Sequence, residues 1–255
     1  VCAGDVERAM RLFRFILRRG VVVHPAVYCA LLREIKKRMN VYNMRKVYIQ
    51  YSYELINEIE KNGRLPTNTR GYLSILSFLA LVGDLTGTMK WFQRLIDSKV
   101  RVNDKCLSCV VRALSEAYKI EEALQFTREV QQKYGLPPNS YMFATIIDGY
   151  VRQKKLTQAM AVFDEMVNDY QIPPNAVVLN TLFMYYVNGK QVDQAMQIFD
   201  SMKKYNVDPL ITTFNLLIKM LSEVSAQSMY SLVSDMITKY NMSPDAFTIS
   251  LMLNA

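Results

Sequence analysis

The chain has 255 residues, 51% hydrophobic and 21% charged, so it can bury a substantial core and is not compositionally disordered. It contains only nine glycines, which favours long helices, and no run of about 18 apolar residues, so no membrane span is expected. The net charge of +8 belongs to residues 1–70, with 14 Lys/Arg and 6 Asp/Glu, because residues 71–255 hold 17 of each. This positive end is either a solvated surface or the neighbour of a polyanion.

A helical pattern opens the chain and returns throughout it. The first copy is Arg8–Phe13, with an alanine followed by apolar residues on one helix face. In chain order, the pattern returns at Thr88–Phe92, Glu122–Phe126, Gln158–Met166 and Gln194–Met202. The later copies lie 35 or 36 residues apart, which indicates internal repeats.

Turns recur at the same phase as this pattern. They lie at Pro66–Asn68, Pro137–Asn139, Pro173–Asn175, Asp208–Leu210 and Ser243–Asp245. Proline ends the preceding helix, and Asn or Asp before an apolar run is a good N-cap for the next one. Two amphipathic stretches lie between successive turns, so each repeat is predicted to be a helix–turn–helix that buries its apolar face against its neighbours.

Within one repeat, the spacing predicts helices over Tyr141–Arg152 and Leu156–Asn168. Phe163 and its counterpart Phe199 are predicted to be buried between the two helices of their own repeat and the next first helix.

The fold class predicted is an all-α, right-handed α-solenoid of helix–turn–helix repeats of 35–36 residues. The predicted segments are 1–24 (second helix of a truncated repeat), 25–68 (an atypical extended repeat with a long second helix through Val41–Lys61), repeats at 69–103, 104–139, 140–175, 176–210 and 211–245, and 246–255 (the start of a further repeat). We expect further repeats to flank this segment, since an apolar helix face at each end would otherwise be exposed.

Residue types that carry catalysis or bind metals are sparse. His24 is the single histidine, and no partner for a metal site or catalytic triad lies near it in the sequence. Cys106 and Cys109 form a CxxC pair inside a predicted helix without a second pair, which favours small core residues over redox chemistry. The sequence therefore predicts no enzyme activity, no metal and no cofactor, although a catalytic domain fused outside this segment stays possible.

Several segments resemble a known repeat family. Phe143–Tyr150 and Leu179–Leu182 look like the first helix of a pentatricopeptide repeat, and Phe163–Met166 and Phe199–Met202 look like its second helix. Tetratricopeptide repeats typically have glycine at the eighth position of the first helix, where this chain has Leu76, Val111, Ile147, Phe183 and Ile218. The resemblance implies that the first helices line a concave surface that binds single-stranded RNA, with one base per repeat.

The resemblance also implies that the fifth and last residues of each repeat contact a base together. The pairs are Cys29 with Asn68, Leu73 with Asn103, Ser108 with Asn139, Ala144 with Asn175, Asn180 with Leu210, and Asn215 with Asp245. Ser108/Asn139 resembles an adenine reader and Asn215/Asp245 a uracil reader, whereas Leu73, Ala144 and Leu210 offer no side-chain hydrogen bond. The terminal Asn and Asp residues are alternatively helix caps alone, and both interpretations stay open at this point.

Phosphate contacts are expected from basic residues late in the first helices. The candidates are Arg33, Lys36, Lys37, Arg38 and Arg152. Of these, Lys37 and Arg152 hold the thirteenth position, where the family often has lysine.

The resemblance favours an organellar RNA-binding protein. The fifth and last residues of each repeat, here called the reading positions, include few polar pairs, and the positive charge lies at one end. Both features favour a subunit of a larger ribonucleoprotein, such as a mitochondrial ribosome or its assembly machinery, with other proteins as further partners. The mitochondrion is preferred to the plastid. The alternatives are a sequence-specific single-stranded RNA processing or stability factor, a protein–protein scaffold without RNA contact, and the recognition arm of a fused RNA-modifying enzyme.

Overall fold

The computed structural model describes residues 4–39, 44–63 and 65–253, and these residues form helices and connecting turns without any strand. The all-α repeat architecture predicted from the sequence is confirmed. The chain forms two compact units, Val1–Ile146 and Ile147–Ala255, here called the N-terminal and C-terminal units. None of the described helices is both long and apolar enough to cross a membrane.

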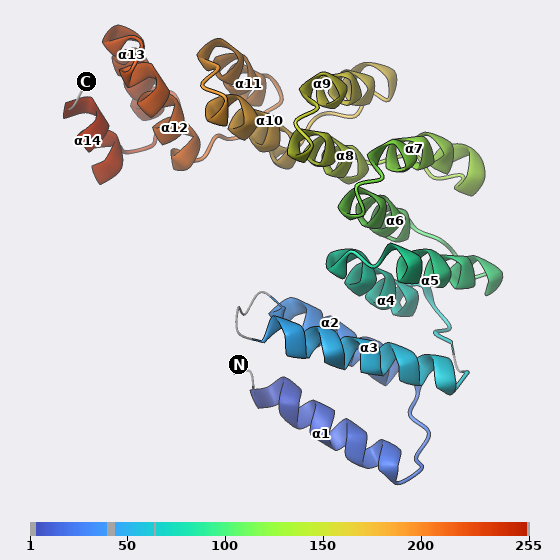
Figure 1. Cartoon of the computed structure of the whole chain (residues 1–255). Helices are drawn as coiled ribbons and strands as arrows, with labels where there is room; N and C mark the ends of the chain where they lie inside the picture. The colour runs from blue at the N-terminus through green and yellow to red at the C-terminus, as the bar shows by residue number, and fades with distance from the viewer. Residues whose placement is uncertain (1–3, 40–43, 64, 254–255) are drawn as a thin grey trace. The chain divides into compact units, whose positions relative to one another are not determined.

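The N-terminal unit is built from helix pairs joined by short turns (Figure 1). Its helices are α1 (Gly4–Arg18), α2 (Pro25–Arg38), α3 (Arg45–Lys61), α4 (Thr69–Val82), α5 (Leu85–Asp97), α6 (Asp104–Glu116), α7 (Ile120–Tyr134) and the first half of α8 (Ser140–Arg152). The first helices α2, α4 and α6 pack side by side, and each packs against its own second helix. The long second helix predicted through Val41–Lys61 is described from Arg45 onward, because Val41–Asn43 lie outside the described residues.

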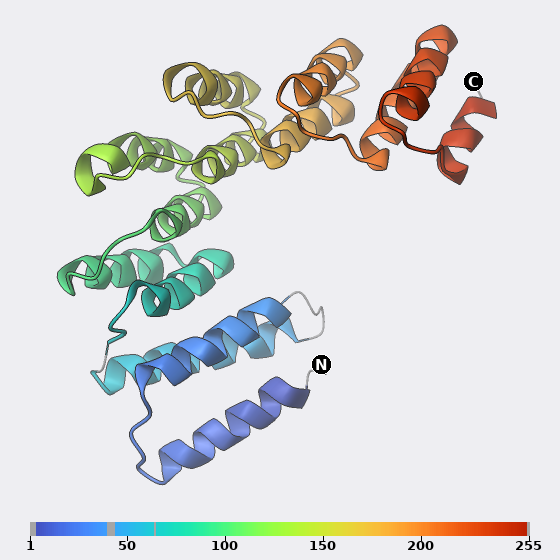
Figure 2. The ribbon, with the colours of Figure 1, turned by 180° about the vertical axis from the view of Figure 1, so that it is seen from behind.

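The C-terminal unit repeats this arrangement (Figure 2). It holds the end of α8, then α9 (Leu156–Asp164), a π-helical turn η1 (Glu165–Asp169), α10 (Ala176–Asn188), α11 (Val192–Lys204), α12 (Ile211–Ser222), α13 (Ala226–Thr238) and α14 (Ala246–Leu253). Here α12 packs against α10 and α14, which makes the first helices neighbours in this unit as well.

Four of the second helices, α5, α7, α9 and α11, bury one small residue at the same repeat position. The repeat alanine is fully buried at Ala123, Ala159 and Ala195, and Thr88 holds the same position with no exposed surface. In α13 the register slips by one residue. Met229 is fully buried there, while Tyr230, which the sequence frame aligns with the alanines, is 49% exposed.

The second helix of residues 140–175 ends in a way that the sequence did not predict. The spacing predicted one helix over Leu156–Asn168, but the α-helical hydrogen bonding stops at Asp164 and η1 follows. A π-turn accommodates one extra residue in a helix without breaking it. The turn toward α10 follows directly after η1.

The predicted burial of the repeat phenylalanines is right for Phe199 and wrong for Phe163. Phe199 is 5% exposed, and its ring centroid lies 5.1 Å from that of Phe214 in an edge-to-face contact. Phe163 is only half-buried. The first helix that follows Phe163 is α10, and it has Leu179 at the position that Phe214 holds in α12. It therefore offers no aromatic ring to Phe163 at that position.

The Phe199→Ala substitution should destabilise the C-terminal unit by about 3–5 kcal/mol, the usual cost of removing a buried aromatic ring. Native-state hydrogen exchange should show the loss concentrated in α11 and α12, since repeats contact mainly their neighbours. Phe163→Ala is the matched control and should cost clearly less. Equal losses in the two variants would contradict this account of the core.

Candidate nucleic-acid interface

With the exception of Leu210, the residue that closes a repeat caps the next first helix. The side-chain oxygens of Asn68, Asn103, Asn139 and Asn175 accept hydrogen bonds from backbone N–H groups three residues later, at 2.9, 2.9, 3.0 and 3.0 Å. These bonds satisfy N–H groups that a helix start leaves without a partner. Asp245 caps α14 in the same way, with 2.8 Å from the Thr248 nitrogen to Oδ1.

Two of these capping residues also bind the fifth residue of their own repeat. Asn139 donates from Nδ2 to Ser108 Oγ at 3.2 Å, and Asn215 donates from Nδ2 to Asp245 Oδ2 at 2.9 Å. In Asn139 and Asp245, one atom of the side chain caps the next helix while the other joins the preceding first helix. Capping and a bond to the fifth residue therefore occur together at these two positions, and the base contacts themselves stay a prediction.

The fifth residues of these two pairs are more enclosed than the sequence suggested. Ser108 and Asn215 are each 7% exposed. Ser108 donates to the Asp104 carbonyl at 2.8 Å, and Asn215 accepts from the Thr248 hydroxyl at 2.5 Å. An amide has two N–H groups and two acceptor lone pairs, so Asn215 keeps one of each for a further partner.

The remaining predicted base-contact residues are less connected. Asn180 is half-exposed and its side chain makes no hydrogen bond to another described residue, while its predicted partner Leu210 is 60% exposed. Ala144 is buried in the N-terminal unit, and Asn175 caps α10 in the C-terminal unit. Cys29 is buried and donates its thiol to the Gly71 carbonyl at 3.6 Å.

A groove of about 960 Å³ runs across the first helices of the N-terminal unit, from α2 over α4 and α6 to the start of α8. Its cationic lining residues, here called the basic groove residues, are Arg33, Lys36, Lys37, Arg70, Lys105 and Arg112. Asp104 is the one carboxylate among the residues that line it, and Ser108 and Asn139 lie at the same surface. The groove therefore combines a strong positive charge with a bonded Ser–Asn pair.

Contacts between helices position two of these cations. Arg33 on α2 donates to Ser74 Oγ on α4, and Arg112 on α6 donates to the Tyr141 hydroxyl on α8, both at 3.5 Å. Burial lowers the pKa of Lys36; Cys109 opposes this shift, and the nearby positive charge of Arg112 adds a smaller lowering. Lys36 is thus a partly desolvated ammonium next to a like charge.

The predicted phosphate contacts are only partly brought together. Arg33, Lys36 and Lys37 line the groove, but Arg38 is half-buried elsewhere on α2. Lys37 pairs with Glu34 at 2.8 Å, and Arg152 pairs with Asp148 at 3.0 Å. Both pairs lie within one helix and are exposed to solvent, so they are weak and leave the cations accessible.

Sequence reasoning missed Arg70, Lys105, Arg112 and Tyr141. Two sequence spacings could have predicted these residues. Arg112 follows Ser108 by one helical turn, on the same face. The other three each hold the second position of a repeat, directly after the first residue of their helix, and all three are exposed.

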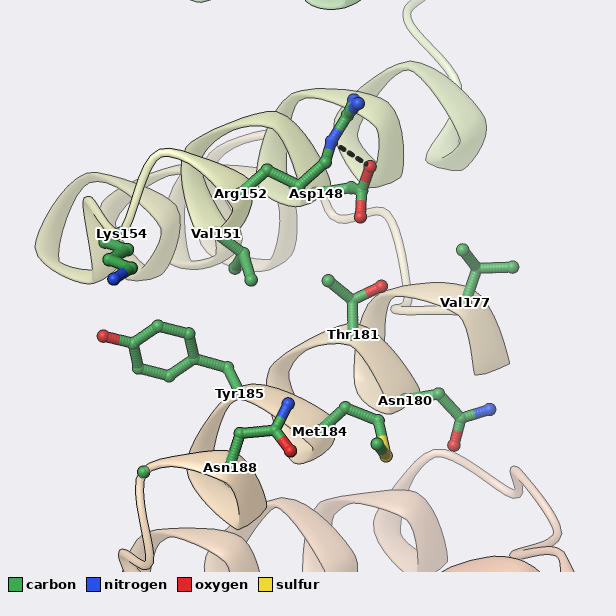
Figure 3. A pocket seen from close by; sticks show the side chains of 11 residues that line it. Asp148, Val151, Arg152, Lys154, Val177, Asn180, Thr181, Met184, Tyr185 and Asn188 are labelled. Carbon is green, nitrogen blue, oxygen red and sulfur yellow. Dashed lines mark ion pairs between the residues drawn. The ribbon is translucent and has the colours of Figure 1, made fainter.

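The C-terminal unit has a second groove, of about 830 Å³, between the end of α8 and α10 (Figure 3). Asn180, Met184 and Asn188 follow one another along α10 at intervals of four residues, and the Arg152–Asp148 ion pair lies on α8. Lys154 is the other cation in the lining. This groove is nearly neutral and partly apolar, in contrast to the basic groove.

Residues that suggested other chemistry have structural roles. His24 caps α2 by accepting a hydrogen bond from the Ala26 nitrogen at 3.2 Å. Burial raises the pKa of the Cys106 thiol to about 11 and that of Cys109 to about 12, which disfavours the reactive thiolate. Within the described residues, no three His, Cys, Asp or Glu side chains are placed to hold a metal ion.

Models of the pentatricopeptide repeat match two stretches of the chain: the PPR repeat at residues 134–167, and the PPR repeat family at residues 174–223. These stretches include the first helices α8 and α10, both of which begin after a capping asparagine. In these two stretches the chain carries pentatricopeptide repeats.

Solved structures of pentatricopeptide repeat proteins share the fold. The repeat protein PPR10 from maize superposes with a TM-score of 0.70 and 24% identity, over 98% of this chain and 34% of that one. PPR10 in complex with an 18-nt psaJ RNA element superposes with a TM-score of 0.67 and 17% identity, over 99% of this chain and 36% of that one. The PPR domain of Arabidopsis thaliana protein-only RNase P 1, in complex with tRNA, superposes with a TM-score of 0.53 and 17% identity, over 76% of this chain and 98% of that one.

The chain thus spans about a third of the length of the PPR10 structures that it matches. A search of curated protein sequences gave no match.

The pH dependence of stability should report the cap at Asp245. Hydrogen bonds from the backbone and hydroxyl of Thr248, together with the Asn215 amide, hold the pKa of Asp245 below its ordinary 3.8. A lowered carboxyl pKa contributes stability that is complete above the ordinary value and disappears as the pH falls through the folded value. In thermal melts, Asp245→Asn should be less stable than the wild type at neutral pH, and the gap should shrink below about pH 4. A gap that stays constant on acidification would contradict the assignment.

Proposed function

We propose that this chain binds single-stranded RNA along the surface formed by its first helices. The basic groove carries the proposal, because it places six cations beside the bonded Ser108–Asn139 pair. Cations of this density hold phosphates. The fold that the chain shares with PPR10 and with the PPR domain of RNase P 1, both solved with RNA, supports the same conclusion.

Single-stranded RNA fits this surface better than a duplex does. Sequence-specific recognition of RNA works on unstacked bases, which stack on aromatic rings or guanidinium planes. Tyr141 is 46% exposed at one end of the basic groove, and Arg70 is exposed at the start of α4. Each offers a flat face to a base that leaves the stack.

The finer proposal is a subunit of an organellar ribonucleoprotein, such as a mitochondrial ribosome or its assembly machinery. Leu73, Ala144 and Leu210 hold reading positions without hydrogen-bonding side chains, so the chain reads few bases. A protein of this kind binds an RNA whose position is also fixed by other proteins. Membership of the repeat family supports an organelle, and we propose the mitochondrion over the plastid on that resemblance alone.

A second candidate, a sequence-specific factor for processing or stabilising one transcript, is favoured by one observation. Asn215 and Asp245 are bonded at 2.9 Å with hydrogen-bonding capacity to spare on Asn215. A single good reader of this kind gives a preference at one base. The two candidates differ in whether the bound sequence matters, which competition between RNAs of different sequence measures directly.

The RNA-binding proposal predicts a specific loss of affinity. Replacing Arg33, Lys36 and Lys37 with Gln should weaken binding of a labelled single-stranded RNA in fluorescence anisotropy titrations. The slope of log K against log salt should become shallower by about 0.7 for each phosphate contact removed.

The matched control replaces Arg8, Arg11 and Arg18 of α1, which carry the same charge in the same unit but do not line the groove. The control should lose much less affinity, because it alters only the long-range field. Equal losses in both triple variants would assign binding to net charge. If the wild type failed to bind RNA at all, the protein–protein scaffold would replace this proposal.

A further inference from the structure

The two grooves differ in charge far more than in size. The basic groove has six cationic side chains and one carboxylate in its lining, whereas the groove of the C-terminal unit has two cations, one of them paired with Asp148 at 3.0 Å. Affinity for phosphates therefore concentrates in the N-terminal unit.

The reading positions of the same unit are poorly suited to bases. Cys29 is 2% exposed, and its thiol is bound to the Gly71 carbonyl. Leu73 carries no hydrogen-bonding group. Ser108 is 7% exposed, and its hydroxyl already donates to the Asp104 carbonyl. Hydrogen bonds to base edges are thus few over the part of the surface where the cations are densest.

The cations themselves are arranged for an anion. Arg112 uses one guanidinium nitrogen on a neutral hydroxyl, that of Tyr141, and so keeps its full charge and most of its donors. Lys105 and Arg70 extend from the exposed starts of α6 and α4. Lys36 is partly desolvated beside Arg112. Like charges held together without matching carboxylates repel one another, and a bound phosphate relieves that repulsion.

We propose that the basic groove is a backbone clamp, which binds the sugar-phosphate chain of a single-stranded nucleic acid without regard to its bases. The inference rests on the proposed RNA binding and assigns the mode of binding in one unit. Arg70, Lys105 and Arg112 are its principal contacts, together with Lys36. Base preference then comes from other positions, among them the Asn215–Asp245 pair in the C-terminal unit.

The test uses a ligand that has a backbone and no bases. A fluorescein-labelled oligomer of abasic sugar-phosphate units is titrated with the whole chain at low salt, beside an RNA of the same length. The wild type should bind the abasic oligomer, more weakly than RNA because base stacking is absent. The Arg70→Gln, Lys105→Gln, Arg112→Gln triple variant should lose most of its affinity for both ligands, and the salt slope for each should fall by about 2, at about 0.7 per contact.

The matched control replaces Arg45, Lys46 and Lys203, exposed cations on second helices, with Gln. It should keep nearly all its affinity for the abasic oligomer. Thermal melts followed by circular dichroism should be recorded for each variant to establish that it folds. If RNA binds but the abasic oligomer does not, or if the control loses as much affinity as the groove variant, the clamp is wrong while RNA binding stands. If neither ligand binds, the proposed function itself fails.

Discussion

The side-chain cap between successive repeats is the interaction on which the surface of this protein depends. A helix start leaves backbone N–H groups without partners, and the last residue of a repeat supplies an acceptor at that point. In Asn139 and Asp245 the same side chain reaches back to the fifth residue of the preceding first helix. One short side chain thereby joins two neighbouring first helices and fixes which face they share. Leu210 makes no side-chain cap, so that bond is missing at the start of α12.

Because the first helices share this face, charged residues that are far apart in the sequence lie close together on the surface. Residues at the fifth, ninth and thirteenth positions follow one another at intervals of four along a first helix, so they form one stripe. In α2 and α6 the ninth residues are Arg33 and Arg112, and both line the basic groove. In α10 the ninth residue is Met184, and the groove there is nearly neutral. Identical backbone geometry thus gives a cationic surface in one unit and a neutral one in the other.

The sequence predicted the repeat class, the helix pairs and the capping turns, because period and turn residues are local properties. It did not predict η1 or the half-burial of Phe163, since both depend on how one helix meets the next. The engagement of Asn215 by Thr248 was missed for a similar reason, because the two residues lie on different helices. Arg70 and Lys105 were not predicted because they lie at the start of a first helix, whereas the resemblance placed basic residues at its later positions.

The most direct test separates the two roles of a capping residue at Asp245. Asp245→Ser keeps an N-cap for α14 but removes the carboxylate oxygen that accepts from Asn215. Binding of RNAs that differ only at the base opposite residues 211–245 should be compared for this variant and the wild type. We predict that the wild type prefers one base there and that Asp245→Ser, while still folded by circular dichroism, loses the preference. An unchanged preference in a folded Asp245→Ser variant would contradict the account.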